Sequence, residues 1–446
     1  MIRVANTGPD FKFIADALNS TGGFADGTYL VAYPRELADK IKSRRELAWY
    51  DNALKPACQR FVGYLLKRPA FRDTQNEALA GFIASCNWQD DSLDVFLSGF
   101  MVDAKARGSM LLLVDMPTQQ QILDGLRTLP YLVPIYPEAI KTYRLNPRGQ
   151  LAAVVFTDQI QDKDGRWVAV ERTYTETGWQ FTGGETGSGT HPLGVCPVLA
   201  FTESGLFPSL GEFATIAVLS KRLYNLRSEL DEILRAQTFS LLMLRVPEAR
   251  FPLADLKEVA QGIGTGNILQ AYQDGAEFIA PPSGPANTYL DVIAQVEGLI
   301  RKAALIVDIP NSNSQESGVA LQLRFQALNS SLVHFARRME DFERKIWWLV
   351  KAWLNLHEAE IAIAWGKDFS IADLATEMEI AQNMAALNAP PAYTRAKLKQ
   401  LVQLDLGALP GDEISDILNA IDEMGLSPPD DPSLPDDPSL PAGLPA

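Results

Sequence analysis

The stretch GVALQLRFQALNSSLVHFARRMEDFERKIWWLVKAWLNL, residues 318–356, carries the strongest structural signal in this chain. Its apolar side chains recur in alternating steps of four and three, the spacing of one face of an α-helix. That face comprises Leu321, Phe325, Leu328, Leu332, Phe335, Met339, Phe342, Ile346, Leu349 and Trp353. No proline interrupts the stretch, so at 1.5 Å per residue it predicts a rod about 60 Å long. Such a helix spans a module or lines an assembly, with a plain core helix as the alternative.

Two further periodic helices precede this rod. The first covers residues 209–236, where Ser209 and Glu212 have the spacing of a capping box. The second covers residues 287–307. Between them the helical period fails: residues 241–246 favour a strand, residues 253–261 a short helix, and three following glycines a loop.

The preceding part of the chain changes from helical to β-like patterning. Residues 35–107 predict several short helices, the last of them capped by Ser92, and residues 110–115 a buried strand. Between residues 131 and 202, turn-forming Gly, Asn and Asp residues separate short apolar segments, which favours β-strands. The sequence therefore predicts an α+β protein that is mainly helical and has a small β-rich part.

The C-terminal region is acidic. Residues 358–446 contain 16 Asp and Glu against four Lys and Arg, so they hold −12 of the total charge of −15. Residues 371–424 favour short helices, and the chain ends in the repeat DDPSLP, residues 430–435 and 436–441. Such sequence buries too little apolar surface to fold, which predicts a disordered tail. An acidic region of this size argues against tight binding of nucleic acid.

Composition narrows the class of protein. The 47% hydrophobic and 21% charged residues are ordinary for a soluble globular protein. No run approaches the roughly 18 apolar residues of a membrane span, and the first residues lack the layout of a signal peptide. The three cysteines, Cys58, Cys86 and Cys196, have no metal-binding or redox spacing and are expected to be buried, reduced thiols.

No motif specifies an active site, a cofactor or a metal. The three histidines (His191, His334 and His357) have no partner in zinc-ligand spacing. The glycine clusters at 183–189 and 262–266 lack the frame of a phosphate-binding loop, and no GxSxG sequence occurs. Acid pairs such as Asp90-Asp91 and Asp115 could serve glycoside chemistry, but any acidic protein supplies such pairs. We therefore expect no catalytic residue.

Basic residues on the first two long helices are the other candidates for a function. They are Lys221, Arg222, Arg227, Arg301 and Lys302. Solvated or salt-bridged helix faces are their ordinary role. The functional alternative is contact with a neighbouring subunit or with a passing phosphate backbone.

Several phrases of this sequence resemble the portal proteins, or head-to-tail connectors, of tailed phages. ESGVAL at residues 316–321 is similar to the "SG.AL" phrase where the loop meets the long helix in many portals. WYDNA, FVGY and KRP between residues 49 and 69 resemble an early wing segment, and YPEAI at 136–140 resembles the start of the β part. The chain is short for the family, and Tyr143 stands where some relatives carry tryptophan.

The resemblance implies a portal-like division of the chain, which we state as an expectation. The parts are an N-terminal arm (1–34), wing (35–205), first stem helix (206–236), clip (237–285), second stem helix (286–307), tunnel loop (308–317), long wing helix and strand (318–369), crown (370–426) and tail (427–446). In the tunnel loop, the neutral residues Asn311, Ser312, Asn313, Ser314 and Gln315 would touch passing DNA without binding it tightly.

The function implied by the resemblance is structural. It predicts a ring of twelve subunits at a capsid vertex, assembled in the bacterial cytoplasm, through which double-stranded DNA is packaged and ejected. Its partners would be the terminase large subunit, a head–tail adaptor and the major capsid protein, with no cofactor and no membrane. Two alternatives stay open: another virion component, such as an adaptor or minor capsid protein, and an α+β enzyme without a recognisable motif.

Overall fold

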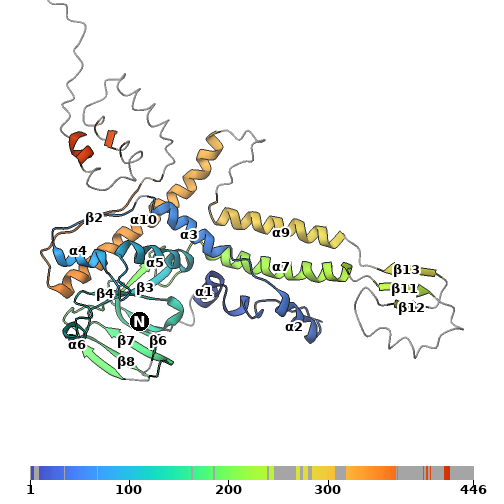
Figure 1. Cartoon of the computed structure of the whole chain (residues 1–446), viewed down its shortest axis with the longest axis horizontal. Coiled ribbons are helices and arrows are strands. Elements are labelled where there is room, and N and C mark those ends of the chain that lie inside the picture. Colours follow the sequence, from blue (N-terminus) through green and yellow to red (C-terminus); the bar gives the residue numbers. More distant parts are fainter. Residues whose placement is uncertain are drawn as a thin grey trace, which may run out of the picture. The chain divides into compact units, whose positions relative to one another are not determined.

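Figure 1 shows the computed structural model of the chain, which divides into two compact units, Met1–Phe369 and Ser370–Ala446. Every helix and strand named below belongs to the first unit. The structure describes residues 2–4, 10–34, 36–67, 69–161, 164–183, 186–238, 241–245, 268–271, 275–279, 284–306, 318–367, 369, 395, 398–399, 402 and 416–421.

Short helices make up most of the first 107 residues. They are α1 (Phe11–Asn19), the 3₁₀ turn η2 (Gly22–Phe24), α2 (Ala38–Leu47), α3 (Leu54–Leu65), α4 (Glu77–Ala84) and α5 (Leu93–Arg107). The side chains of Asp10, Asn76 and Ser92 cap α1, α4 and α5 by accepting backbone N–H groups of the first turn. Helix α5 ends at Gly108, where φ is +80° and a Cβ would lie 1.9 Å from the backbone nitrogen of Gly211.

Two antiparallel sheets follow α5. The smaller has the order β10–β3–β4, with β3 (Ser109–Asp115) in the centre, β4 (Tyr131–Ile135) on one side and β10 (Val198–Thr202) on the other. The larger has the order β1–β5–β6–β7–β8–β9. Its strands are β1 (Ile2–Val4), β5 (Ile140–Leu145), β6 (Leu151–Gln161), β7 (Trp167–Thr175), β8 (Gly178–Thr182) and β9 (Gly187–Thr190). The short helix α6 (Gln119–Leu123) and the turn η3 (Pro137–Ala139) flank β4.

A pair of long helices with a small sheet between them comes next. Helix α7 (Ala214–Thr238) leads into the sheet β12–β11–β13, and α9 (Gly284–Ala303) then packs along α7 (Figure 1). The strands of this sheet are β11 (Leu241–Arg245), β12 (Ile268–Ala271) and β13 (Gly275–Ile279), with β12 parallel and β13 antiparallel to β11.

The longest helix is α10 (Gly318–Leu354), followed by strand β14 (Ala362–Ala364). Asn355 ends α10 in a left-handed conformation with φ 54°. Strand β14 pairs antiparallel with β2 (Phe71–Asp73), so the end of this unit joins a segment almost 300 residues earlier.

Two apolar cores hold the first unit together. The larger gathers α1, α3, α5, α7, α9 and α10, with Phe335, Met339 and Ile346 of α10 fully buried in it. The smaller core lies between the sheet β10–β3–β4 and the six-stranded sheet that contains β5, β6 and β7. Strand β3 serves both, because its side chains alternate: Met110, Leu112 and Val114 face the helical core, whereas Leu111 and Leu113 face the core between the sheets.

The α+β class expected from the sequence is confirmed. So are the long helix from residue 318, the buried strand after Gly108, the cap at Ser92 and the strand within residues 241–246. The three cysteines are buried and unpaired, and burial raises the pKa of each thiol to about 12. In the described part of the chain, no helix is long and apolar enough to span a membrane.

One predicted helix start is wrong. Ser209 and Glu212 do not form a capping box, and α7 begins only at Ala214. The carboxylate of Glu212 instead accepts from Lys105 Nζ at 2.7 Å and from the Ser331 hydroxyl at 2.7 Å. A fully buried ammonium competes for this carboxylate more strongly than a backbone N–H group can.

Several expected segments lie outside the described residues. They are the helix at 253–261, the loop residues 311–315, most of the region 370–426 and the tail 427–446. Statements about them therefore remain predictions.

Candidate functional sites

The helix pair α7 and α9 is the first candidate site. Helix α9 buries Ile293, Val296 and Ile300 on one face, as its three- and four-residue spacing requires. Along its other face Asn287, Leu290, Asp291, Ala294 and Gln295 are exposed. The residues that the structure describes therefore cover only one side of α9.

Large apolar side chains stand exposed on both helices of this pair. They are Val218 (60% exposed) and Leu234 (44%) on α7, and Leu290 (53%) and Leu299 (47%) on α9. Scattered exposed apolar residues are common. At 3.6 residues per turn, the separation of nine residues between Leu290 and Leu299, and of 16 between Val218 and Leu234, places the two members of each pair on different sides of their helix, where two different neighbours could cover them. We call these four residues the apolar helix-pair surface.

Two of the predicted basic residues are held within the chain. Lys221 Nζ lies 4.8 Å from the centre of the Tyr29 ring. Arg227 pairs with Asp51 at 2.9 Å and with Glu297 of α9 at 3.0 Å. The Arg227 pair to Glu297 joins the two helices, which is the ordinary structural role weighed for such residues.

The other three predicted basic residues are Arg222, Arg301 and Lys302, and each is exposed. Arg222 is on α7, whereas Arg301 and Lys302 are in the last turn of α9. Basic side chains in a last helical turn interact favourably with the helix dipole. Their contact with a subunit or with DNA remains a proposal.

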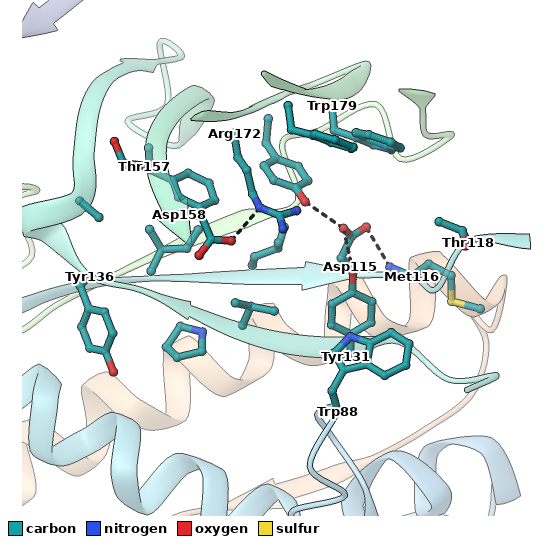
Figure 2. Close-up of a pocket in the computed structure, with 18 of the residues that line it drawn as sticks. Trp88, Asp115, Met116, Thr118, Tyr131, Tyr136, Thr157, Asp158, Arg172 and Trp179 are labelled. Carbon is teal, nitrogen blue, oxygen red and sulfur yellow. Dashed lines mark hydrogen bonds and ion pairs between the residues drawn. The ribbon is translucent and has the colours of Figure 1, made fainter. Parts of the chain in front are cut away.

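A pocket between the sheet β10–β3–β4 and the six-stranded sheet is the second candidate site (Figure 2). Its volume is about 470 Å³, within the range usual for ligand sites. Strands β3 and β4 contribute one wall and β6, β7 and β8 the other, while Trp88 comes from the segment after α4. We call this cavity the sheet pocket.

Asp115 is the central polar group of the sheet pocket. It ends β3 on the face of Leu111 and Leu113, so strand alternation points it between the sheets. One carboxylate oxygen, Oδ2, accepts hydrogen bonds from the hydroxyls of Tyr131 at 3.3 Å and Tyr174 at 3.0 Å. The other, Oδ1, accepts from the N–H of Met116 at 2.9 Å (Figure 2). Burial raises the pKa of Asp115 despite these hydrogen bonds.

A second charged pair lies in the same pocket. Arg172 Nε donates to Asp158 Oδ2 at 2.7 Å (Figure 2). The carboxylate of Asp158 is thereby neutralised within the chain. Aromatic rings complete the walls: Trp88 lies against Tyr131 with ring centres 5.2 Å apart, and Trp179 stacks on Phe181 at 5.6 Å.

The chemistry of the sheet pocket points to binding. Its hydroxyl side chains other than the tyrosines, Thr118 and Thr157, have no histidine or lysine beside them in the lining. Among the residues described, no cluster of three or more His, Cys, Asp and Glu could hold a metal ion. What the pocket offers a ligand is one fixed carboxylate among aromatic faces.

The sequence does not predict this pocket, although Asp115 is among the acids considered for glycoside chemistry. The signal available was a lone acid at the end of an apolar strand, on the side that alternation assigns to the interior. The two tyrosines that donate to Asp115, Tyr131 and Tyr174, come from two different strands, β4 and β7. No local pattern connects them.

Comparison with known proteins gives the following. No family model matches the chain, and no curated protein matches its sequence. A chain from the virion of a native gene transfer agent particle aligns over 92% of this chain and 99% of its own, with 14% identity and a TM-score of 0.41. A chain from the neck of the native particle, computed with C12 symmetry, covers 89% and 95%, with 13% identity and a TM-score of 0.40. One from the neck of the empty particle covers 89% and 97%, with 12% identity and a TM-score of 0.38.

Proposed function

We propose that this chain is the subunit of a portal ring, a structural component of a phage-like virion through which DNA passes. The observation that carries the proposal is the order of elements: helix α7, the small sheet β11–β13, helix α9 and then the long helix α10. This is the order of stem, clip, stem and wing helix that the resemblance to portals requires. The sheet β11–β13 supports the clip, for which the sequence predicted only one strand.

The exposed side of the helix pair supports assembly into a ring. At 1.5 Å per residue α7 is about 37 Å long, and α9 covers only part of it. The apolar helix-pair surface has no cover in the described residues of one chain. Neighbouring copies of the same pair on its two sides would bury it, and repetition of such a contact closes a ring when the rotation between copies divides the full circle evenly.

Charge supports a passive role toward DNA. Residues 358–446 carry −12 of the net −15, and the rest of the chain is nearly balanced. Phosphates are repelled by carboxylates, so a channel formed by this protein would leave DNA mobile. The chain would then serve the packaging terminase, the head–tail adaptor and the major capsid protein as a docking platform, with no catalysis of its own.

The test is direct imaging of the purified full-length protein by negative-stain electron microscopy, with mass photometry for the stoichiometry. The proposal expects closed rings with a central channel and a mass near twelve subunits. Monomers or open filaments at all concentrations would contradict it. Because adaptors also form rings, a second arm measures binding of the ring to the terminase large subunit. A ring that binds tail components but never terminase would favour the adaptor alternative.

A further inference from the structure

We propose that the sheet pocket binds an organic cation, the guanidinium or ammonium group of an arginine or lysine side chain, with Asp115 as its counter-ion. This proposal is independent of the ring. It rests on the unused bonding capacity of Asp115, on its charge, and on the aromatic walls around it.

Asp115 has one acceptor position left for a ligand. A carboxylate offers about four lone-pair positions. Tyr131 and Tyr174 occupy two on Oδ2, and the N–H of Met116 occupies one on Oδ1. The remaining position is on Oδ1. These three donors also fix the orientation of the carboxylate, so a ligand would not have to order it.

The charge of Asp115 is not balanced within the described part of the chain. No ion pair joins it to a lysine or arginine there. Two basic side chains lie near it: Arg172, which is engaged by Asp158, and His191, which bonds through Nε2 to the Thr175 carbonyl at 3.0 Å. Burial accordingly raises the pKa of Asp115, and a bound cation would reverse that shift.

The aromatic walls suit a cation. The faces of Trp and Tyr rings attract ammonium and guanidinium groups within about 6 Å of the ring centre. Trp88 and Tyr131 stand together on one side, and Trp179 is stacked with Phe181 on the other. The pocket already seats one guanidinium in this manner, because the centre of the Arg172 group lies 6.0 Å from the Phe181 ring.

The cation could come from another protein's side chain or from a free small molecule. The probes that separate these sources are N-acetyl-arginine-N-methylamide, which mimics a side chain on a backbone, and agmatine, a free small molecule with a guanidinium at one end and an ammonium at the other. N-acetyl-citrulline-N-methylamide has nearly the same shape without the charge and is the matched control ligand. Binding of each to the full-length protein is measured by isothermal titration calorimetry, with the fluorescence of Trp88 as a second signal.

The result expected is saturable binding of capped arginine at least about tenfold tighter than that of capped citrulline. Asp115→Asn should weaken binding of the cation about tenfold or more. The control Asp124→Asn removes an exposed carboxylate at the C-terminal cap of α6, outside the pocket, and should change nothing. Trp88→Leu, at a side chain that is 39% exposed, should weaken binding without unfolding the protein.

The outcomes divide clearly. Equal binding of citrulline and arginine, full affinity in Asp115→Asn, or no saturable binding of any cation would each overturn the proposal. If capped arginine binds at least as tightly as agmatine, the ligand is a side chain of a partner protein. If agmatine binds and the capped residue is excluded, the ligand is a free cation. Neither result depends on whether the protein forms rings.

Discussion

Arg72 and Glu343, 271 residues apart, form a two-pronged ion pair in the core of the first unit: Nε lies 2.5 Å from Oε1 and Nη2 lies 3.1 Å from Oε2. Both side chains are almost completely buried. Glu343 also accepts the indole N–H groups of Trp347 at 3.0 Å and Trp365 at 2.8 Å. This carboxylate thus joins β2, α10 and the segment after β14.

Glu343→Gln should destabilise the fold by about 3 kcal/mol, because it keeps the side-chain volume but removes the buried counter-ion of Arg72 and leaves that guanidinium paired only with Asp94, which is 54% exposed. The measurement is equilibrium unfolding in urea. The adjacent substitution Arg344→Gln is the control: it breaks a pair with Glu340 whose arginine is 57% exposed, and should cost less than about 1 kcal/mol. Equal losses in the two variants would contradict this account.

Glu212 should make the stability of the fold fall measurably at acid pH. Burial alone would raise the pKa of its carboxyl, but Lys105 at 2.7 Å and the Ser331 hydroxyl outweigh burial and hold this pKa below the usual 4.5. A carboxyl with a lowered folded-state pKa stabilises the fold above its unfolded pKa, and that contribution disappears as the pH falls through the folded value.

The variant Glu212→Gln should therefore lower Tm near neutral pH and flatten the fall of Tm below 4.5. Thermal unfolding followed from about pH 3 to pH 7 measures both effects. Glu358→Gln, at an exposed carboxylate, removes the same charge and should leave the curve as in the parent protein. If Tm falls equally at acid pH in Glu212→Gln and in the parent protein, the prediction is refuted.

The apolar helix-pair surface should control assembly. Leu290→Glu places a carboxylate in a contact that we expect to be dry, so assembly should require about tenfold more protein or more, which is about 1.4 kcal/mol. Mass photometry across a dilution series measures the change, and circular dichroism checks that helices persist. Gln89→Glu adds the same charge at an exposed polar position outside the helix pair and is the control. Rings as stable in Leu290→Glu as in Gln89→Glu would remove this surface from the interface.

The loop residues 311–315 should tolerate neutral changes but not positive charge. If residues 308–317 are the tunnel loop that we propose, Ser312→Lys combined with Ser314→Lys would attract DNA phosphates where the sequence now has only neutral side chains. Packaging should slow or abort while rings still assemble, as measured by DNA filled per capsid. Ser312→Ala with Ser314→Ala should package normally. Normal packaging by the lysine variant would contradict the proposal that this loop lies in the channel.

Elements that depend on local pattern could be predicted from the sequence. The long apolar face of α10 and the cap at Ser92 follow from side-chain spacing alone, and the structure confirms both. Helix α1 could have been found in the same way, since Asp10 precedes Phe11, Ile14 and Leu18 at helical spacing. The portal resemblance predicts only an N-terminal arm for residues 1–34.

Features that depend on distant partners could not be predicted. The expected cap at Glu212 failed because Lys105, 107 residues away, takes its carboxylate. The sheet pocket is invisible for the same reason: Asp115 meets Tyr174 only after two sheets have packed. Local propensity decides where a helix or strand forms, whereas the partner of a buried charge is decided by tertiary packing.

The pairing of β14 with β2 has a consequence for synthesis on the ribosome. Strand β2 is made early, but its partner among the described strands, Ala362–Ala364, is made almost 300 residues later. At about 5–20 residues per second, that gap lasts roughly 15 to 60 s. Throughout this interval the nascent chain exposes the unpaired edge of β2 and the side chain of Arg72, which is buried in the finished fold. Chaperone capture of the growing polypeptide is therefore expected before residue 365 emerges, and release after it.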